Sequence, residues 1–520
     1  MSDKTKVAGT TDTGTTDIAA GKQDALAELK ARLATLTDLE GASSLLGWDQ
    51  NTYMPPGGAE ARAQQLATLG KLSHELLTEA RVGELLKELG GAGFAEDSDE
   101  AALLRVTQRD FDRATKFPAD FVESFTRLRS EGQQVWARAR QDSDFAGFAP
   151  TLERLLDYSL RAADYLGYED HPYDALHDLF EPGSKVGAVK EVFAELRDAT
   201  VVLLQVLKEA GREIDATPLH GHFARDVQEK FGKRIVSDFG YSFEHGRLDP
   251  TVHPFASSSS KYDVRITTRY DETFLSQALF GTMHEAGHGM YEQYVDSSYD
   301  RGPLGGGASL GVHESQSRLW ENLVGRSHGF WSHYYPYAQE LFPDLGGVSL
   351  ADFYAAINRV KPSFIRVEAD EVTYNLHIMV RFELELALLE GSLKVKDLPE
   401  AWNGKYEDYL GVTPPNDALG CLQDIHWSFG AVGYFPTYTL GNIMSVQFFE
   451  AAKRAHPELA DEIAQGNFET LLSWLRENIY RHGSKYEPAD LLRRVTGSGL
   501  DAGPYIAYLS SKFKALYGVD

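Results

Sequence analysis

The chain has 520 residues, 42% of them hydrophobic and 11% aromatic, which is typical of a globular protein with a large core. Its 77 acidic residues outnumber its 51 basic residues, and the net charge of −26 argues against nucleic acid or an anionic membrane as a partner. The only cysteine, Cys421, excludes an intrachain disulfide and a thiolate metal cluster, so a transition-metal site must use histidine and carboxylate.

The N-terminal residues 1–23 are rich in Thr, Gly and Asp and lack the apolar segment of a signal peptide. We expect them to form a disordered tail ahead of one large unit at 24–520. No run of 18 apolar residues occurs, so we expect no membrane span and a cytoplasmic location.

Most of the chain after the tail carries apolar residues at helical spacing. The first such helix, at 24–48, is followed by the breaker Met54-Pro-Pro-Gly-Gly58 and by a second helix at 59–77. Further helices are predicted at 99–141, 148–166, 186–211, 222–239, 311–330, 348–360, 369–391 and 397–410, and again in the C-terminal part. No repeat or composition shift marks a domain boundary, so the sequence predicts a single, mainly α unit.

One segment, Tyr262 to Tyr270, alternates β-branched and aromatic residues with polar ones and predicts a strand. The polar run 257–260 before it predicts a loop, and a helix is expected to begin near Thr273. The sequence thus predicts a small β element directly beside that helix.

The helix expected from Thr273 contains the sequence His284-Glu285-Ala-Gly-His288. Since positions i and i+4 share a helix face, His284 and His288 can direct two imidazoles at one metal ion. Glu285 can then serve as the general base for a water molecule at that ion. From this motif alone, the alternative is a pair of ordinary core histidines.

A catalytic zinc ion needs three protein ligands and one open position, so a third ligand must come from another helix. Glu314, beyond the glycine-rich loop 302–307, is the best candidate, because a glutamate on an apolar helix needs a partner for its charge. The alternatives are a surface carboxylate and an ion pair with Arg318. The neighbouring His313 points about 100° away from Glu314 on a helix and is left outside the ligand set.

Five short motifs follow one another along the chain: Asp263-Val-Arg265-Ile-Thr267, His284-Glu-Ala-Gly-His288, His313-Glu-Ser-Gln-Ser317, Ile365-Arg-Val-Glu-Ala-Asp370 and Gly420-Cys-Leu-Gln-Asp-Ile-His-Trp427. Together with WDQNTYMPPGGAEARAQQLATL at 48–69, they resemble the motifs of the carboxypeptidase Taq family of HExxH zinc metallocarboxypeptidases. The resemblance extends from about residue 24 to the C-terminus and shows no departure at a motif position.

This resemblance implies a metal-dependent carboxypeptidase that releases single amino acids from the C-terminal end of peptides, with 24–520 as its catalytic domain. The implied fold is a mainly helical saddle with a deep active-site groove, similar to angiotensin-converting enzyme and neurolysin, and the implied assembly is a homodimer. Carried over by motif, the metal ligands are His284, His288 and Glu314, and Glu285 is the catalytic base. The implied cofactor is Zn²⁺, with Co²⁺ or Mn²⁺ as alternatives.

A carboxypeptidase must also bind a free α-carboxylate, for which the planar guanidinium of arginine is suited. Arg265 and Arg366, each in one of the five motifs, are the candidates for this substrate-binding role. For both arginines the alternative is a structural ion pair, for instance with Asp263 or Asp370.

Donors for the substrate oxyanion are the next requirement. His426 and Tyr434 could donate these hydrogen bonds, as a histidine and a tyrosine do in the similar angiotensin-converting enzyme. Gln423 is a candidate for binding the substrate, and Asp424 for orienting the substrate or His426. For Gln423 and Asp424, the alternative is structural support in the core.

Three other functions compete with the carboxypeptidase. The same metal site in a groove could serve an endo-oligopeptidase or a dipeptidyl carboxypeptidase. An aminopeptidase would need acidic residues for the substrate ammonium, and no such motif occurs. A helical binding protein with a structural metal is disfavoured, because structural zinc sites usually have four protein ligands and prefer cysteine.

Overall fold

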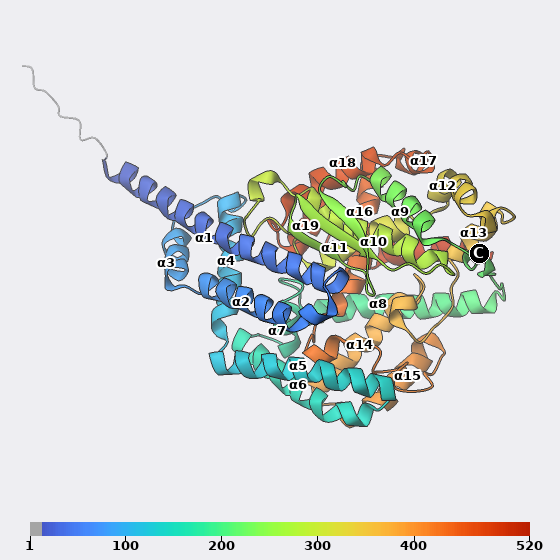
Figure 1. Cartoon of the computed structure of the whole chain (residues 1–520), viewed down its shortest axis with the longest axis horizontal. Coiled ribbons are helices and arrows are strands. Elements are labelled where there is room, and N and C mark those ends of the chain that lie inside the picture. The colour runs from blue at the N-terminus through green and yellow to red at the C-terminus, as the bar shows by residue number, and fades with distance from the viewer. Residues whose placement is uncertain (1–12, 520) are drawn as a thin grey trace, which may run out of the picture.

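The computed structural model describes residues 13–519, with the side chains described from residue 21 onward (Figure 1). Residues 1–12 of the expected tail lie outside the described part of the chain, and the first helix begins at Thr13. None of the helices in the described part has the length and apolar character needed to cross a lipid bilayer.

The described residues form twenty α-helices and one three-stranded sheet, which confirms the predicted mainly α fold. The helices are α1 (Thr13–Thr52), α2 (Ala59–Leu77), α3 (Ala80–Gly90), α4 (Asp99–Lys116), α5 (Ala119–Asp142), α6 (Phe145–Leu166), α7 (Pro172–His177), α8 (Val186–Glu209), α9 (Arg225–Phe239), α10 (Leu275–Gln293), α11 (Leu310–Arg318), α12 (His328–Leu341), α13 (Leu350–Ile357), α14 (Tyr374–Leu389), α15 (Leu398–Leu410), α16 (Pro436–Ala455), α17 (Leu459–Ala464), α18 (Glu469–Asn478), α19 (Pro488–Thr496) and α20 (Gly503–Tyr517).

The helix expected at 99–141 is divided into α4 and α5 in the structure. Phe117, between the two helices, has the extended backbone angles φ −88° and ψ 127°. The following Pro118 accounts for this, because the ring of a proline disfavours helical angles at the residue before it.

The polar run at 257–260 was expected to be a loop, and that prediction is wrong. It belongs to strand β2 (Ala256–Ser260), which pairs antiparallel with β3 (Asp263–Thr268), while β1 (Gly246–Pro250) pairs parallel with the other edge of β3. The serines suit this position because α1 lies against β2: Ser44 Oγ is 2.8 Å from Ser257 Oγ. A Cβ atom on Gly41 would lie only 2.5 Å from the carbonyl oxygen of Ser259.

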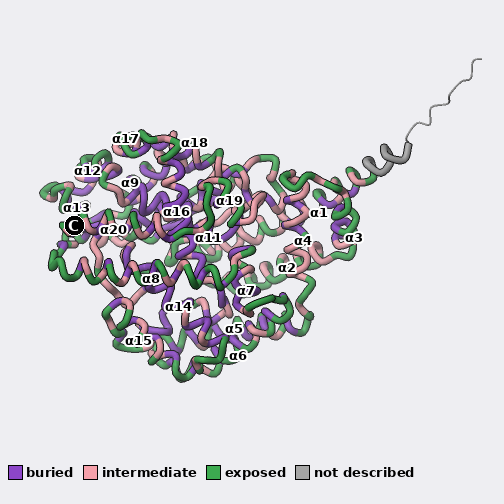
Figure 2. Tube along the Cα trace, turned by 180° about the vertical axis from the view of Figure 1, so that it is seen from behind, coloured by how far each residue is buried: buried purple, intermediate pink, exposed green. Residues whose placement is uncertain are grey.

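Most buried side chains belong to one large hydrophobic core, whose segments gather around α11, α14 and α16 (Figure 2). A smaller, separate cluster joins α1, α3 and α4 at the other end of the molecule and includes Leu33, Leu85 and Leu103. Polar contacts connect this end to the rest, such as Lys485 Nζ to Asp99 Oδ1 at 2.7 Å.

Helix α10 lies in the large core with Met283 and Met290 fully buried. Its Gly287 allows α11 to approach, because a Cβ atom there would lie 2.6 Å from the carbonyl oxygen of Gln316 and from the Cα of Ser317. The two helices that carry the predicted metal ligands are therefore in direct backbone contact.

Candidate metal centre

Helices α10 and α11 bring together the three predicted metal ligands. The Nε2 atoms of His284 and His288 each lie 3.6 Å from Oε2 of Glu314. One ligand atom from each residue lies within 4.8 Å of the other two. Two imidazole nitrogens and one carboxylate oxygen form a donor set that suits a catalytic zinc ion, so these residues fit a metal.

The orientation of His284 is set by a second carboxylate, that of Glu321. Nδ1 of His284 lies 2.9 Å from Oε2 of Glu321. Burial raises the pKa of Glu321, but Arg318 and His284 lower it more, to about 2, so this carboxylate is ionised and accepts the hydrogen bond. The proton of His284 is thereby held on Nδ1, and the lone pair of Nε2 points toward Glu314.

Sequence reasoning missed Glu321, although a signal was present. Residues 314, 318 and 321 are spaced by four and three, which places them on one helix face. The chain after α11 forms a π-helical turn at Leu319–Val324 that contains Glu321. Such turns are rare and occur frequently at functional sites.

From the sequence, Arg318 was considered as an alternative partner for Glu314. In the structure Glu314 contacts both Arg318 and the two histidines. Nε of Arg318 lies 2.7 Å from Oε1 of Glu314, while the other carboxylate oxygen faces the histidines. Burial raises the pKa of Glu314, but the charges of Arg318 and His284 lower it well below its ordinary value. Glu314 is thus a permanent anion that uses one oxygen for the arginine and offers the other as a ligand.

Glu285 is buried beside the ligands, and this burial raises the pKa of its carboxyl to about 7. A carboxyl with such a pKa can accept and release a proton near neutral pH, as a general base must. His313 has a different partner: its Nε2 lies 2.8 Å from Oε1 of Glu292 on α10. His313 therefore stands outside the ligand group.

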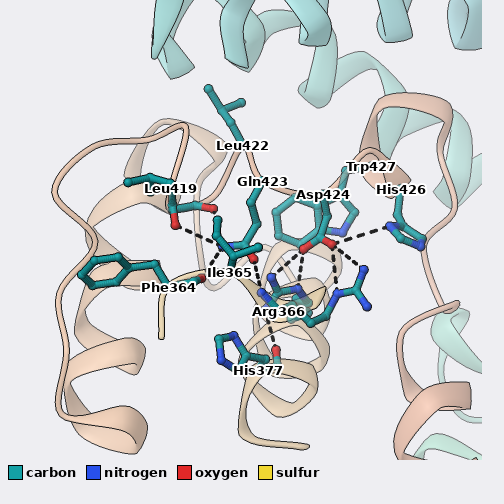
Figure 3. A network of polar contacts seen from close by, with 12 residues as sticks. Phe364, Ile365, Arg366, His377, Leu419, Leu422, Gln423, Asp424, His426 and Trp427 are labelled. Atoms are coloured by element: carbon teal, nitrogen blue, oxygen red, sulfur yellow. Dashed lines mark hydrogen bonds and ion pairs between the residues drawn. The ribbon is translucent and has the colours of Figure 1, made fainter. Parts of the chain in front are cut away.

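A second polar network surrounds Asp424 (Figure 3). Oδ1 of Asp424 accepts hydrogen bonds from Nε and Nη2 of Arg366 at 3.0 and 2.8 Å, and Oδ2 accepts one from Nε of Arg381 at 2.6 Å. The structural ion pair considered for Arg366 exists, with Asp424 in place of Asp370. Sequence reasoning missed Arg381, a fully buried residue of α14.

Arg265 also has a partner within the protein. Its Nε and Nη2 lie 2.7 and 2.9 Å from the two carboxylate oxygens of Asp263, and its guanidinium lies 4.3 Å from the ring centre of Trp48. This bidentate pair is the structural alternative weighed for Arg265, and it packs β3 against α1.

The amide of Gln423 is bound to protein backbone at both ends. Its Oε1 accepts from the backbone N–H of Arg366 at 2.9 Å, and its Nε2 donates to the carbonyl of Phe364, also at 2.9 Å. These are the contacts of a residue that supports the Arg366 segment (Figure 3). Binding of the substrate by Gln423 stays a prediction.

His426 and Tyr434 lie together, with ring centres 5.0 Å apart. Nε2 of His426 is 3.4 Å from the hydroxyl of Tyr438, and its Nδ1 is 4.0 Å from Oδ1 of Asp424. Burial lowers the pKa of His426 to about 4, so the imidazole is uncharged at neutral pH. Burial and then the charge of Glu314 raise the pKa of Tyr434, so this phenol lies within electrostatic reach of the metal ligands.

Tyr374 connects the Asp424 network to the ligand group. Its hydroxyl accepts a hydrogen bond from Nη1 of Arg366 at 3.1 Å, and the guanidinium of Arg318 lies 4.4 Å from its ring centre. A continuous series of contacts therefore runs from Asp424 through Arg366, Tyr374 and Arg318 to Glu314. The two networks are parts of one site.

The pattern of the carboxypeptidase Taq (M32) metallopeptidase family matches residues 28–513. The chain belongs to this family. Thermostable carboxypeptidase 1 of Thermus thermophilus is 44% identical over 504 residues, covering 95% of this chain and 98% of the relative. Carboxypeptidase 1 of Bacillus subtilis is 40% identical over 477 residues, covering 92% and 95%. The crystal structure of the M32 carboxypeptidase from Deinococcus radiodurans R1 superposes with a TM-score of 0.93 at 44% identity, covering 95% of this chain and 100% of that one.

These matches confirm the resemblance carried by the five motifs. As an M32 metallocarboxypeptidase, the chain is a metal-dependent peptide hydrolase. The alternative hypothesis of a helical binding protein is therefore not supported. The three residues His284, His288 and Glu314, with Glu285 beside them, could hold a metal ion.

Proposed function

We propose that this M32 carboxypeptidase binds Zn²⁺ through His284, His288 and Glu314 and releases single amino acids from the C-terminal end of peptides. The observation that carries the proposal is the convergence of the three ligand atoms within 4.8 Å of one another. The buried Glu285 beside them supplies the base. Co²⁺ and Mn²⁺ are the alternative metals, because imidazole and carboxylate ligands also accept them.

A divalent ion at these ligands supplies a Lewis acid, which lowers the pKa of a water molecule and polarises the scissile carbonyl. In the proposed reaction, Glu285 takes the proton from the attacking water, and its raised pKa suits it to hold that proton. Glu285 then delivers the proton to the nitrogen of the leaving amino acid. His426 and Tyr434 donate hydrogen bonds to the substrate oxygen as negative charge develops on it.

Of the two arginine candidates for the substrate carboxylate, the contacts favour Arg366. It touches Tyr374, whose ring packs against Arg318 at the ligand group, whereas Arg265 lies between Asp263 and Trp48 of α1. In this proposal, Gln423 aids substrate binding by holding the backbone of Arg366. Arg265 remains the second candidate.

The names of the relatives favour a carboxypeptidase over an endo-oligopeptidase or a dipeptidyl carboxypeptidase. We further propose that residues 24–520 form the catalytic domain, and that the enzyme is a cytoplasmic homodimer. The dimer follows from the family resemblance, and the location from the sequence features described above.

Product analysis on one peptide, with a free or an amidated C-terminus, tests the proposed direction of attack. After metal reconstitution, the free peptide should release single amino acids stepwise from its C-terminal end, and the amidated peptide should be cleaved far more slowly. Internal fragments or dipeptides as the first products would replace this proposal by one of its alternatives.

A further inference from the structure

Glu385 of α14 is a fully buried carboxylate for which the proposed reaction has no use. Its Oε1 accepts a hydrogen bond from Nε1 of Trp427 at 2.8 Å. Its Oε2 accepts from the hydroxyl of Tyr173 at 2.7 Å and from the backbone N–H of Gly433 at 3.1 Å. Both oxygens are therefore occupied by donors.

Two of these donors stand next to the proposed oxyanion residues. Trp427 directly follows His426, and Gly433 directly precedes Tyr434. A single carboxylate thus holds both ends of the segment 426–434, whose terminal residues lie with ring centres 5.0 Å apart.

Gly433 is also held from its other side. Its carbonyl oxygen lies 2.8 Å from Nδ1 of His177. The residue has a φ of +90°, and a Cβ atom there would lie 2.8 Å from the backbone nitrogen of His177. The backbone at Gly433 is therefore packed between Glu385 on one side and His177 on the other.

Burial raises the pKa of the Glu385 carboxyl to about 7, while its hydrogen bonds and the charge of Arg381 in the Asp424 network favour the ionised form. Arg381 lies one turn before Glu385 on α14, and it shares Asp424 with Arg366. Arg381 thus pairs with Asp424, two positions before His426, and lies within electrostatic reach of Glu385. Helix α14 holds the segment at both points.

We propose that Glu385 is a positioning residue that sets His426 and Tyr434 in place for the substrate oxyanion. This inference rests on the proposed role of His426 and Tyr434 as oxyanion donors. The hydrogen-bonding pattern requires a carboxylate, because Trp427 Nε1–H and Gly433 N–H can only donate. A glutamine would turn its own NH₂ group toward one of these two donors and leave that donor unpaired.

The test is Glu385→Gln in the metal-loaded enzyme. We expect kcat to fall about tenfold to a hundredfold, as a displacement of catalytic groups by about 1 Å can cause, with KM and bound metal little changed. The matched control is Tyr173→Phe, which removes one hydrogen bond from the same carboxylate but leaves both N–H donors paired, so kcat should stay close to wild type. Glu383→Gln on the same helix controls for the loss of any partly buried carboxylate, since Glu383 pairs with Arg197 on another face.

A double-mutant cycle with Tyr434→Phe separates positioning from general structural support. If Glu385 acts through Tyr434, Glu385→Gln should lower kcat much less in the Tyr434→Phe background than in the wild type. A loss in the Tyr434→Phe and the His426→Gln backgrounds that equals the loss in the wild type would overturn the positioning role. Should Tyr434→Phe and His426→Gln each leave kcat unchanged, the proposed oxyanion donors would be wrong instead.

Trp427→Phe provides a second route if Glu385→Gln does not fold. It removes the donor to Oε1 and leaves Gly433 paired with Oε2. Because Trp427 is next to His426, we expect a smaller loss of kcat that is reduced in the His426→Gln background. An equal loss in the wild type and in His426→Gln would again contradict the inference.

Discussion

Gly441 of α16 lies so close to Glu314 of α11 that a Cβ atom on the glycine would be 2.5 Å from the Cβ of the glutamate. Real Cβ atoms do not come this close to another carbon, so any side chain at position 441 must push the two helices apart or displace Glu314. Glu314, the proposed third metal ligand, can thus take this position because the opposite helix has no side chain at position 441.

We therefore expect Gly441→Ala to weaken metal binding about tenfold to a hundredfold, the range seen when residues that support metal ligands are changed. Metal affinity can be measured by competition with a chelator. Gly404→Ala in α15 is the matched control, because a Cβ atom there has nothing within 4 Å. That control should bind metal normally and should gain up to about 1 kcal/mol of stability from the better helix former.

Removal of the metal should abolish hydrolysis. The three proposed ligands are two histidines and a glutamate, and a site of this kind exchanges its ion with a chelator. Peptide hydrolysis should disappear on chelation and return with Zn²⁺ or Co²⁺. Full activity in protein shown by elemental analysis to be metal-free would refute the assignment.

Glu285 and Glu314 should respond differently to substitution. Glu285→Gln removes a base and no ligand, so it should retain bound metal and lose several orders of magnitude in kcat. Glu314→Ala should lose the metal, and it also leaves Arg318 buried with one carboxylate fewer. Metal content and kcat, measured on both variants, check the two roles. Stoichiometric, tightly bound zinc in Glu314→Ala would mean that the third ligand lies elsewhere.

A free C-terminus should be recognised by an arginine. A charge-assisted pair with the substrate carboxylate contributes about 1.5–3 kcal/mol, so amidation should lower kcat/KM by about one to two powers of ten. Arg366→Leu should erase the difference between free and amidated peptides, while Asp424 keeps Arg381 as a partner. Arg265→Leu should lower stability and leave the ratio of kcat/KM between free and amidated peptides unchanged. If instead Arg265→Leu erased this difference and Arg366→Leu did not, Arg265 would bind the substrate carboxylate.

Glu181 offers a test of pH-dependent stability at a residue outside the proposed ligand set. Burial raises the pKa of this carboxyl from 4.5 to about 7, although it accepts hydrogen bonds from Ser309 Oγ and the Gly311 N–H at the start of α11. Because the folded state then binds more protons than the unfolded state, stability falls as the pH rises from 4.5 to about 7.

Glu181→Gln removes this dependence and can still accept from Gly311 and pair with Ser309. At pH 8 the variant should have a higher melting temperature than the wild type, and its free energy of unfolding should be higher by at most about 3 kcal/mol. This gain should become smaller toward pH 5. Thermal unfolding at several pH values checks this. A difference that does not change with pH would contradict the proposed titration.

The sequence by itself determined the parts of the protein that depend on local spacing. Apolar periodicity predicted the mainly α fold, and two histidines four residues apart predicted a metal site on one helix face. A motif allowed Glu314 to be predicted as the third ligand, and the alternation at 262–270 located the strand β3 at Asp263–Thr268. Each of these signals is a short pattern of residues that are close together in the sequence.

Tertiary structure decided which side chains meet across long stretches of sequence. Asp424 is bound by Arg366, 58 residues away, and by Arg381, 43 residues away. The chain has many other arginines and carboxylates, so the sequence could not show that these particular residues form ion pairs. The serines of β2 predicted a loop because a run of serines has no strand pattern of its own. Pairing with β3 and contact with α1 make this segment a strand. Hydrogen bonds, ion pairs and close approaches such as that of Gly441 to Glu314 depend on the distance between atoms in space. This distance cannot be inferred from the number of residues between them in the sequence.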